Sequence, residues 1–469
     1  MEGVITRETS VAIVGGGPGG YEAALVAAQL GAEVTVVEKD GIGGAAVLTD
    51  CVPSKALIAT ADQRADLDVA VRLGVSLPGP AQAPTEGVVA RARAINGRIL
   101  ELAAAQSMDI RKSLEQAGVR MLDGAGRLLE RGQVQVETAD GSLDLTADVV
   151  LLATGATPRV LPTAVPDGER ILTWQQIYAL EDLPGHLVVI GSGVTGAELA
   201  QGFLGLGSAV TLVSSRDRVL PGEDADAATL IEDVFRERGM KVLSRSRAQG
   251  VERSADGVLV TLTDGRTVEG SHALLAVGSL PQTSGLGLQD LGIELSESGH
   301  IVVDRVSRTS VPSVYAAGDC TGVLPLASVA AMQGRIAMWH ALGDAVAPLN
   351  VRGVAANIFT DPEIATVGIG QRVADELHDV QSVMLPLARN PRAKMQGIEA
   401  GFVKLFCRTG YGTVLGGVVV APKASELVFP VALAVQNRLS VDAVASTITV
   451  YPSLSGSIAE AARQLHQSE

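Results

Sequence analysis

The amino-acid sequence predicts an α/β fold with largely parallel sheets, because of its composition and one repeated pattern. Hydrophobic residues make up 47% of the 469 residues and charged residues 19%, which supplies enough apolar material for a large buried core. Aromatic residues reach only 3%, whereas glycine occurs 53 times, so the core must consist of Ala, Val, Leu and Ile between many tight turns. This balance suits parallel layers, whose strands are buried on both faces. At about 100–200 residues per domain, the length predicts about three domains.

The repeated pattern first appears near the N-terminus. It is expected to form a strand, a glycine-rich turn, a helix and a second strand, at 11–14, 15–20, 21–30 and 34–37. The turn has the form G-x-G-x-x-G, in which Gly15 allows the tight turn, Gly17 lets the backbone approach a pyrophosphate, and Gly20 lets helix and strand pack closely. Glu38 follows, where a carboxylate accepts hydrogen bonds from ribose hydroxyls. The pattern predicts a dinucleotide-binding unit with phosphates at the helix N-terminus.

The same pattern returns in the middle of the chain. It consists of a strand, a turn, a helix and a strand, expected at 187–190, 191–196, up to 204 and 209–213. Gly191, Gly193 and Gly196 take the places of the three glycines. Two such turns indicate two dinucleotides, which is what an enzyme needs to pass a hydride from a nicotinamide to a second bound cofactor. A duplicate retained only for structure is the alternative.

The second copy has no acidic residue at the ribose position. Ser214, Ser215 and Arg216 stand there instead. A carboxylate would repel a 2′-phosphate, whereas Ser and Arg side chains can bind one. We therefore predict that NADPH is accepted, alongside or in place of NADH. The other interpretation is that Arg216 is only a solvated surface charge.

Net charge and cysteine content argue against several classes of protein. A formal net charge of −15 disfavours binding to nucleic acid or to an anionic membrane surface. Three cysteines are too few for an extracellular disulfide framework, and six histidines without clustered Cys or His spacing predict no metal site. The N-terminus lacks a basic-then-apolar signal pattern, so we expect a cytoplasmic protein. The apolar stretch 187–213 contains six glycines and a central glutamate, so we interpret it as strand, turn, helix and strand rather than a membrane span.

Several motifs beyond Glu38 resemble those of one enzyme family. In chain order these are Ala153-Thr154-Gly155, Val277-Gly278, Val314-Tyr315-Ala316-Ala317-Gly318-Asp319 and Phe359-Thr360-Asp361-Pro362-Glu363-Ile364-Ala365. Together the motifs resemble the FAD-containing pyridine nucleotide–disulfide oxidoreductases, such as dihydrolipoamide dehydrogenase, glutathione reductase and mercuric reductase, over nearly the whole chain. The resemblance implies two Rossmann-like dinucleotide-binding domains, for FAD and for NAD(P), and a C-terminal α+β dimerisation domain in a homodimer.

The implied domains follow one another in four segments. They are an FAD-binding segment at 1–155, an NAD(P)-binding domain at 156–276, a second FAD-binding segment at 277–350 and an interface domain at 351–469. The first segment contains a stretch with helical spacing from about Thr85 to Gly118. The last contains an apolar strand at 415–420 and a helical segment at 424–436, which fit a dimerisation layer.

The resemblance also implies contacts with the cofactors. Asp319 is expected to bind the ribityl chain of FAD, and the helix from about Ala327 is expected to point its N-terminus at the flavin pyrimidine ring. A helix N-terminus carries about +0.5 charge, which stabilises an anionic reduced flavin. Further cofactor-binding positions are expected at Gly44, Cys51, Lys55, Thr154, Gly155, Glu198 and Gly278.

Two departures separate this chain from the disulfide reductases of the family. Their signature G-G-T-C-x-N-x-G-C-x-P-S-K corresponds to residues 43–55, in which Cys51 keeps the second cysteine and Ala46 replaces the first. A lone thiol cannot close an intramolecular disulfide. Near the C-terminus, Tyr451 replaces the catalytic histidine and Gly456 replaces its carboxylate partner, so the acid–base group of the thiol chemistry is missing as well. The sequence predicts a flavoenzyme without a dithiol relay.

Lys55 and Glu198 retain the family pattern. The family pairs this lysine with the glutamate and places it near flavin N5, where an ion pair helps to tune the flavin and to position the nicotinamide. The family's gating tyrosine is Val194 here. Cys51 is either a thiol in contact with the flavin or a relic packed beneath it, and we expect Cys407, in an apolar strand, in the core.

These observations favour an NAD(P)H dehydrogenase that reduces quinones or similar small electron acceptors. Within the family the sequence resembles most closely the NAD(P)H:quinone reductase flavoproteins, at residues 43–48, at Cys51 and at 451–456. One alternative is a dihydrolipoamide or other disulfide reductase that uses Cys51 with a second thiol from elsewhere. The other alternative is an FAD-binding protein without catalytic activity.

Overall fold

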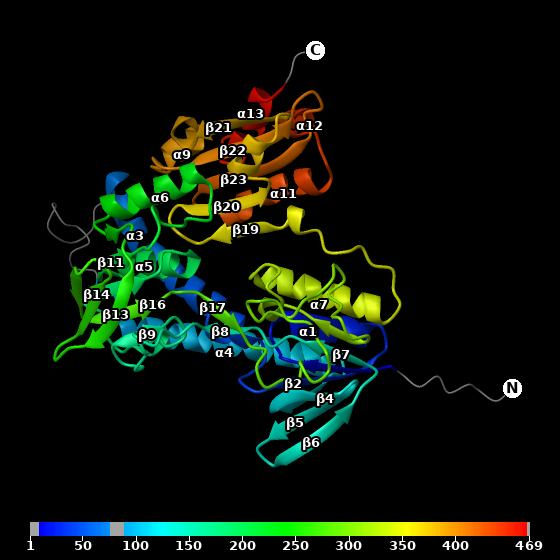
Figure 1. The fold of residues 1–469 in the computed structure, drawn as a ribbon. Helices are drawn as coiled ribbons and strands as arrows, with labels where there is room; N and C mark the ends of the chain where they lie inside the picture. The colour runs from blue at the N-terminus through cyan, green and yellow to red at the C-terminus, as the bar shows by residue number, and fades with distance from the viewer. Residues whose placement is uncertain (1–8, 76–88, 467–469) are drawn as a thin grey trace. The chain divides into compact units, whose positions relative to one another are not determined.

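The computed structural model describes residues 9–75 and 89–466, which divide into two compact units (Figure 1). The first unit consists of residues up to Pro53 together with Gly97–Arg159 and Ser279–Asn350. The second unit consists of Ser54–Asn96, Val160–Gly278 and the residues from Val351 onward. Each unit contains one of the two glycine-rich turns.

A parallel five-stranded sheet forms the centre of the first unit, in the order β18-β7-β1-β2-β3. Its strands are β1 (Ser10–Val14), β2 (Glu33–Glu38), β3 (Arg120–Asp123), β7 (Val149–Leu152) and β18 (Val314–Ala316). The helices of this unit are α1 (Pro18–Gln29), α2 (Gly44–Leu48), α4 (Ala92–Gln116, of which the unit takes the part from Gly97) and α7 (Ala327–Ala341). A smaller antiparallel sheet contains β4 (Ala125–Glu130), β5 (Gln133–Thr138) and β6 (Gly141–Thr146).

Alternate residues of β1 belong to two different hydrophobic cores. Val11 and Ile13 pack with the helices α1, α4 and α7, whereas Ala12 and Val14 pack on the side of β4 and β5. Because successive side chains of a strand point to opposite faces, the four apolar residues bury both faces of the sheet at its centre. This confirms the prediction, from the aliphatic composition, of a parallel sheet covered on both sides.

The second unit repeats this arrangement. Its parallel sheet has the order β12-β11-β10-β16-β9 and is accompanied by an antiparallel sheet β13-β14-β15. The parallel strands are β9 (Ile171–Thr173), β10 (His186–Ile190), β11 (Ala209–Val213), β12 (Lys241–Leu243) and β16 (His272–Leu275). The antiparallel strands are β13 (Ala248–Arg253), β14 (Val258–Leu262) and β15 (Thr267–Gly270). The helices are α3 (Cys51–Arg72, of which the unit takes the part from Ser54), α5 (Val194–Leu206) and α6 (Ala225–Glu237).

An antiparallel sheet in the order β19-β20-β23-β22-β21 forms the remainder of the second unit. Its strands are β19 (Ala355–Ile358), β20 (Glu363–Gly368), β21 (Val380–Pro386), β22 (Phe402–Arg408) and β23 (Val414–Ala421). Its helices are α8 (Gln371–Glu376), α9 (Pro391–Met395), α10 (Ala424–Leu427), α11 (Phe429–Gln436), α12 (Val441–Ser446) and α13 (Gly456–Gln464). Helices α10, α11 and α13 share one hydrophobic core with the sheet. We call residues 351–466 the interface segment.

Two sequence-based boundaries changed in detail, and a third segment formed as predicted. The helical segment expected at 424–436 is divided into α10 and α11, because Pro430 has no N–H for a bond to the preceding turn. The helix expected from Thr85 to Gly118 is found as α4, and residues 85–88 lie outside the described part of the chain. The stretch 187–213 forms β10, a turn, α5 and β11, as predicted. No described helix is both long and apolar enough to cross a membrane.

Candidate functional site

The first glycine turn accepts only glycine at two of its three positions. Gly15 has a φ of +107°, and a Cβ built on it would lie 2.2 Å from the carbonyl oxygen of Ala153. A Cβ on Gly20 would lie 1.9 Å from the carbonyl oxygen of Gly15. At Gly17, by contrast, a Cβ would meet no protein atom within 4 Å. Glycine is therefore needed at Gly17 only if a ligand comes close to the backbone there, which fits the pyrophosphate of a dinucleotide.

Helix α1 begins directly after this open position. Gly17 is its N-cap, and no side chain accepts a hydrogen bond from the first turn. The uncapped N–H groups and the positive end of the helix dipole are suited to a phosphate. Gly44 also approaches the turn, since a Cβ on it would lie 2.8 Å from the Cα of Gly17. The first unit thus provides a backbone cradle that fits FAD.

Glu38, at the end of β2, is anchored by backbone donors. Its Oε2 accepts a hydrogen bond from the N–H of Gly16 at 2.6 Å, and its Oε1 accepts one from the N–H of Asp40 at 2.7 Å. A carboxylate has about four lone-pair positions, so it can still accept hydrogen bonds from ribose hydroxyls. The position of Glu38 beside the cradle fits the role predicted from the sequence.

Four other predicted FAD positions lie in the first unit. Asp319 follows β18 and is half-buried, and burial raises the pKa of its carboxyl, while His300 acts in the opposite direction. Ala327 is the first residue of α7, whose N-cap residue makes no side-chain cap. Thr154 donates a hydrogen bond from Oγ1 to the carbonyl of Gln282 at 2.6 Å, and Gly155 has a φ of +69°. The roles of these four residues in binding FAD stay predictions.

The second glycine turn has the same construction. Gly191 has a φ of +110°, and a Cβ on it would lie 2.1 Å from the carbonyl oxygen of Ala276. A Cβ on Gly196 would lie 2.0 Å from the carbonyl oxygen of Gly191, whereas Gly193 has no protein atom within 4 Å of that position. Gly278, with a φ of +93°, follows β16 two residues after Ala276. The second unit thus provides a second dinucleotide cradle.

The residues after β11 differ in exposure. Ser214 is fully buried, and its Oγ lies 2.7 Å from the Oγ of Ser192 and accepts a hydrogen bond from the N–H of Arg216 at 3.1 Å. Its hydroxyl therefore shapes the turn, while Ser215 and Arg216 are exposed. Arg245, which sequence reasoning missed, donates its backbone N–H to the carbonyl of Arg216 at 2.8 Å. It follows β12, so only the pairing of β11 with β12 reveals that the two arginines are neighbours.

Lys55 and Glu198 form an ion pair within the second unit. The Nζ of Lys55 lies 2.8 Å from Oε2 of Glu198, which is only 2% exposed. The other carboxylate oxygen, Oε1, accepts a hydrogen bond from the N–H of Phe359 at 2.9 Å. The ammonium group of Lys55 also lies 5.2 Å from the centre of the Phe359 ring. The sequence predicted the pair from the family resemblance, but Phe359 carries no sequence signal for this contact.

None of the three cysteines forms a disulfide. Cys51 begins helix α3 and is half-exposed. Cys320 and Cys407 are fully buried in hydrophobic cores, as predicted for Cys407, and burial raises the pKa of the Cys320 thiol to about 11. Neither buried thiol has the exposed, anionic character of a redox cysteine.

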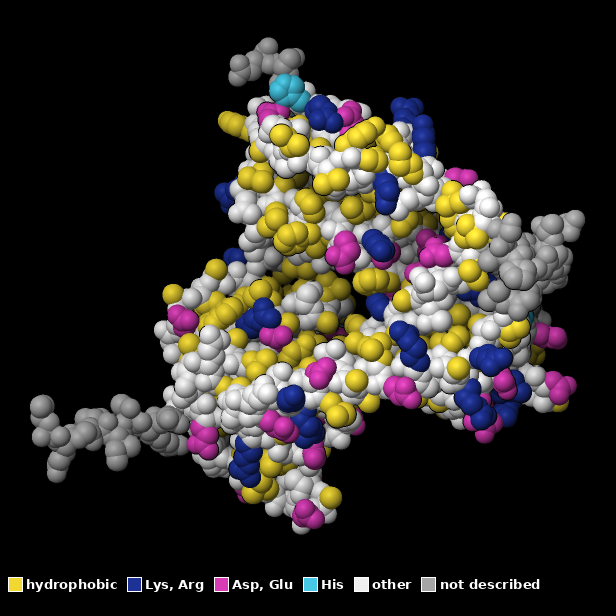
Figure 2. All heavy atoms as spheres, turned by 180° about the vertical axis from the view of Figure 1, so that it is seen from behind, with side chains coloured by type: hydrophobic (Ala, Val, Ile, Leu, Met, Phe, Trp, Pro, Cys, Tyr) yellow, Lys and Arg dark blue, Asp and Glu magenta, His cyan; other side chains and the backbone are white. Residues whose placement is uncertain are grey.

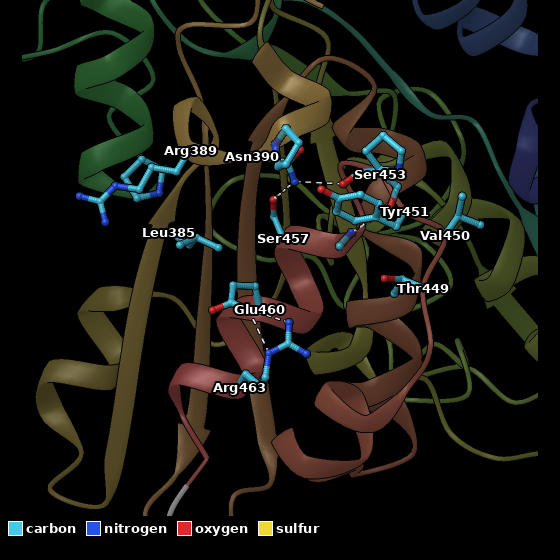
Figure 3. A pocket seen from close by; sticks show the side chains of 14 residues that line it. Leu385, Arg389, Asn390, Thr449, Val450, Tyr451, Ser453, Ser457, Glu460 and Arg463 are labelled. Atoms are coloured by element: carbon cyan, nitrogen blue, oxygen red, sulfur yellow. Dashed lines mark hydrogen bonds and ion pairs between the residues drawn. The ribbon is translucent and has the colours of Figure 1, made fainter. Parts of the chain in front are cut away.

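Tyr451 and Gly456 line a pocket of about 260 Å³ in the interface segment (Figure 3). Figure 3 shows Tyr451 beside Asn390, whose side-chain amide donates hydrogen bonds to the carbonyl of Ser453 and to the Oγ of Ser457. Gly456 begins α13, and a Cβ on it would meet side-chain oxygens at 3.5 Å or more. The positions that hold the acid–base pair in disulfide reductases therefore hold an exposed phenol and a residue without a side chain. Among the described residues, no group of His, Cys, Asp or Glu side chains is arranged to hold a metal ion.

Comparisons with known proteins agree with this geometry. The chain matches the family model for pyridine nucleotide-disulphide oxidoreductases at residues 9–334 and that for the dimerisation domain of the same family at residues 354–462. It is 55% identical to an NAD(P)H dehydrogenase (quinone) of Mycobacterium tuberculosis, over 97% of this chain and 94% of the relative. It is 32% identical to a dihydrolipoyl dehydrogenase of Bacillus subtilis, over 97% and 96% of the two chains.

A solved structure shows the same fold over nearly the whole chain. The crystal structure of LpdA from M. tuberculosis aligns with a TM-score of 0.92 at 54% identity, covering 98% of this chain and all of that one. The two-cradle fold predicted from the sequence is thus confirmed. The chain belongs to the pyridine nucleotide-disulphide oxidoreductase family, whose members bind FAD and NAD(P)H.

Proposed function

We propose that this protein is an FAD-dependent NAD(P)H dehydrogenase that reduces quinones or similar small acceptors without a dithiol relay. One observation carries the proposal: both dinucleotide cradles are intact, while Ala46 and Tyr451 replace the first redox cysteine and the catalytic base. The name of the 55% identical relative, an NAD(P)H dehydrogenase (quinone), supports the same activity.

The residues of the first unit are proposed to hold FAD. The cradle at 15–20 would bind the pyrophosphate, Glu38 the adenosine ribose, and Asp319 the ribityl chain. Gly44, Thr154, Gly155 and the N-terminus of α7 at Ala327 would surround the rest of the cofactor. Bound FAD supplies two-electron chemistry between a nicotinamide and an acceptor. The Lys55–Glu198 ion pair is proposed to place a fixed positive charge where reduction makes the flavin more negative.

The residues of the second unit are proposed to hold NADPH. The cradle at 191–196 would bind its pyrophosphate, while Arg216 and Arg245 supply cations for a 2′-phosphate. Arg245 is paired with Asp217 at 2.8 Å, but this pair is exposed and therefore weak enough to exchange for a phosphate. Ser215 is exposed and can add a hydroxyl donor.

A homodimer is proposed from the interface segment. Residues 354–462 match the dimerisation domain of the family. Large apolar side chains of this segment are exposed in the single chain, among them Phe429, Ile448, Val450 and Tyr451. Figure 2 shows hydrophobic side chains on one face of this segment, with isolated charged groups between them. Apolar patches of this kind are typical of surfaces that another chain covers. We also propose a cytoplasmic location, because three cysteines are too few for an extracellular disulfide framework.

Steady-state kinetics with several acceptors test the proposed function. We expect menadione and benzoquinones to be reduced with NADPH or NADH, and lipoamide not to be reduced, because no second thiol accompanies Cys51. Ala46→Cys alone should not restore lipoamide reduction, since Tyr451 and Gly456 still lack the base. Rapid lipoamide turnover by the unmodified protein would contradict the proposal.

The alternative of a disulfide reductase would need a second thiol near Cys51. The only other cysteines, Cys320 and Cys407, are buried in cores. Titration of thiols after reduction with NADPH distinguishes the two functions, since the alternative requires two reactive thiols per flavin. A failure of NAD(P)H to reduce the flavin would instead favour an FAD-binding protein without catalytic activity.

A further inference from the structure

The Lys55–Glu198 ion pair is held in place by a segment from a distant part of the sequence. The Glu198 carboxylate is almost completely buried, and each of its oxygens has a different partner. Oε2 lies 2.8 Å from the ammonium group of Lys55, and Oε1 accepts the backbone N–H of Phe359 at 2.9 Å. Rotation of the carboxylate would break one of these charge-assisted hydrogen bonds, so the N–H of Phe359 fixes the direction of the oxygen that faces Lys55.

The same residue also contacts the cation. The Phe359 ring lies 5.2 Å from the ammonium group of Lys55, within the distance at which a cation is attracted to an aromatic face. Lys55 is 29% exposed, so its long side chain could otherwise adopt other rotamers. Phe359 therefore restricts the position of the Lys55 ammonium group in two ways. Its ring contacts the ammonium group directly, and its backbone N–H holds the Glu198 carboxylate that pairs with it.

The backbone around Phe359 is itself anchored to helix α5. Gln201 lies three residues after Glu198, and hence on the same face of the helix. Its Oε1 accepts a hydrogen bond from the N–H of Asp361 at 2.7 Å, and Gln201 is buried. Asp361 also forms a salt bridge of 2.7 Å with Arg238. Two points of one helix face thus hold residues 359–361 at a fixed distance from Lys55.

We propose that Phe359 is a positioning residue that sets the place of the Lys55 ammonium group, with Gln201 as its support. The inference rests on the proposed function for the role of Lys55 beside the flavin, but its geometry lies wholly within the second unit. A cation held in one place stabilises the reduced, more anionic flavin better than a mobile one. Loosening Lys55 should therefore make the flavin potential more negative and slow hydride transfer, without weakening the binding of NADPH.

The first test uses Phe359→Leu and Phe359→Tyr in the holoenzyme. The leucine variant keeps the backbone N–H but loses the ring, whereas the tyrosine variant keeps both. For Phe359→Leu we expect a more negative midpoint potential, measured in a dithionite titration, and a limiting rate of flavin reduction by NADPH that is about 3- to 10-fold lower, as for the loss of one cation–π contact. The apparent dissociation constant of NADPH should stay unchanged, and Phe359→Tyr should behave like the unmodified protein.

Phe402 offers a matched control. Its ring lies 5.8 Å from the ammonium group of Lys404, which is paired with Asp224 and Asp226 rather than with Glu198. Phe402→Leu removes the same kind of ring from the same kind of cation, and we expect it to leave the flavin potential and the reduction rate unchanged. Gln201→Met, which removes only the acceptor for the N–H of Asp361, should shift both quantities in the same direction as Phe359→Leu, by a smaller amount.

A double-mutant cycle decides whether Phe359 acts through Lys55. In a Lys55→Met background, Phe359→Leu should cause no further change in the potential or the rate. The proposal is overturned if Phe359→Leu leaves the potential at its original value, if it shifts the potential equally in both backgrounds, or if Lys55→Met alone has no effect. Failure of the proposed function remains distinguishable, because dithionite gives the potential even when NADPH does not reduce the flavin.

Discussion

The glycine turns at 15–20 and at 191–196 have nearly the same backbone, yet the side chains beside them differ. The first glycines have φ values of +107° and +110°, and each lies against a carbonyl oxygen at the end of a neighbouring strand. The N-cap glycines, Gly17 and Gly193, also have almost equal backbone angles, with φ and ψ of −70° and −176° in one and −72° and −173° in the other. A short sequence pattern thus produces the same phosphate cradle twice.

The difference lies after the second strand of each copy. In the first unit Glu38 extends its carboxylate to the N–H of Gly16, so an acid lies beside the cradle. In the second unit Ser214 turns inward to Ser192, and Arg216 and Arg245 lie outside. The cradle binds what every dinucleotide shares, whereas the residues after the strand distinguish one ribose from another. We therefore propose that these residues distinguish the ribose bound in the first unit from the ribose bound in the second.

The largest expected effect comes from the first glycine of each turn. Gly15→Ala should abolish FAD binding, because its Cβ would lie 2.2 Å from a backbone oxygen at a φ that alanine rarely adopts. Gly191→Ala should leave FAD bound and abolish reduction by NAD(P)H. Flavin absorbance per chain and bleaching by NADPH measure the two effects. The same phenotype in both variants would contradict the separation of the cradles.

Controls for these variants exist in both units. Gly97 and Gly185 have ordinary φ values, and a Cβ on either would meet no atom within 4 Å. Gly97→Ala and Gly185→Ala should bind FAD and be reduced like the unmodified protein. Loss of flavin in either control would show that the assay reports general instability rather than the geometry of the cradle.

Prediction from sequence succeeded where local patterns determine the structure. The strands beside the glycine turns and the turns themselves follow from apolar runs and from glycine spacing, which act over a few residues. The start of α7 was predicted from the family resemblance instead. The inward orientation of Ser214 was not predictable, because it depends on Ser192, a residue on the preceding turn. The roles of Arg245 and Phe359 were not predicted, although Phe359 lies in one of the family motifs. Arg245 approaches Arg216 through strand pairing, and Phe359 contacts Glu198 through its backbone N–H, and neither contact can be recognised from the sequence.

A smaller effect is expected from the arginines of the second cradle. Arg216→Ala and Arg245→Ala should each raise the KM for NADPH about tenfold, which corresponds to the loss of one charge-assisted hydrogen bond. The KM for NADH should not change, because NADH has no 2′-phosphate. Steady-state kinetics with both nucleotides measure the ratio. Arg218, which is exposed on the same loop, provides a control as Arg218→Ala.

The same kinetics test why the second copy has no acidic residue after β11. Equal changes in the KM for NADPH and for NADH would show that the arginines do not bind the 2′-phosphate. The replacement of an acid such as Glu38 by Ser214 would then affect only the geometry of the turn. A preference for NADH in the unmodified protein would reject the predicted use of NADPH outright.

The smallest expected effect concerns the helices that support the cradle helices. In the first unit α1 packs against α7, where a Cβ on Gly334 would lie 2.1 Å from the carbonyl oxygen of Gly19. In the second unit α5 packs against α3, where Gly202 leaves room for Leu57.

Of these two supporting helices, α7 and α3, only α3 carries a half-buried carboxyl with a strongly shifted pKa. Burial raises the pKa of Asp62 to about 7, repulsion from Asp361, Asp66 and Glu363 adds to this, and Arg238 opposes it.

The raised pKa makes the second unit sensitive to pH in one direction. In the unfolded chain Asp62 loses its proton near its ordinary pKa of 3.8, whereas in the folded protein it keeps the proton up to about pH 7. Between these values the folded state binds more protons, so the contribution of Asp62 to stability falls as the pH rises and is lost above about pH 7. Asp62→Asn should therefore raise the unfolding temperature by a few degrees at pH 8, and by progressively less toward pH 4. The control Asp233→Asn, at an exposed site on α6, should show no such trend. If the unfolding temperatures of Asp62→Asn and of the unmodified protein change in parallel with pH, the ionised carboxylate of Asp62 is tolerated beside its acidic neighbours, which would contradict the prediction.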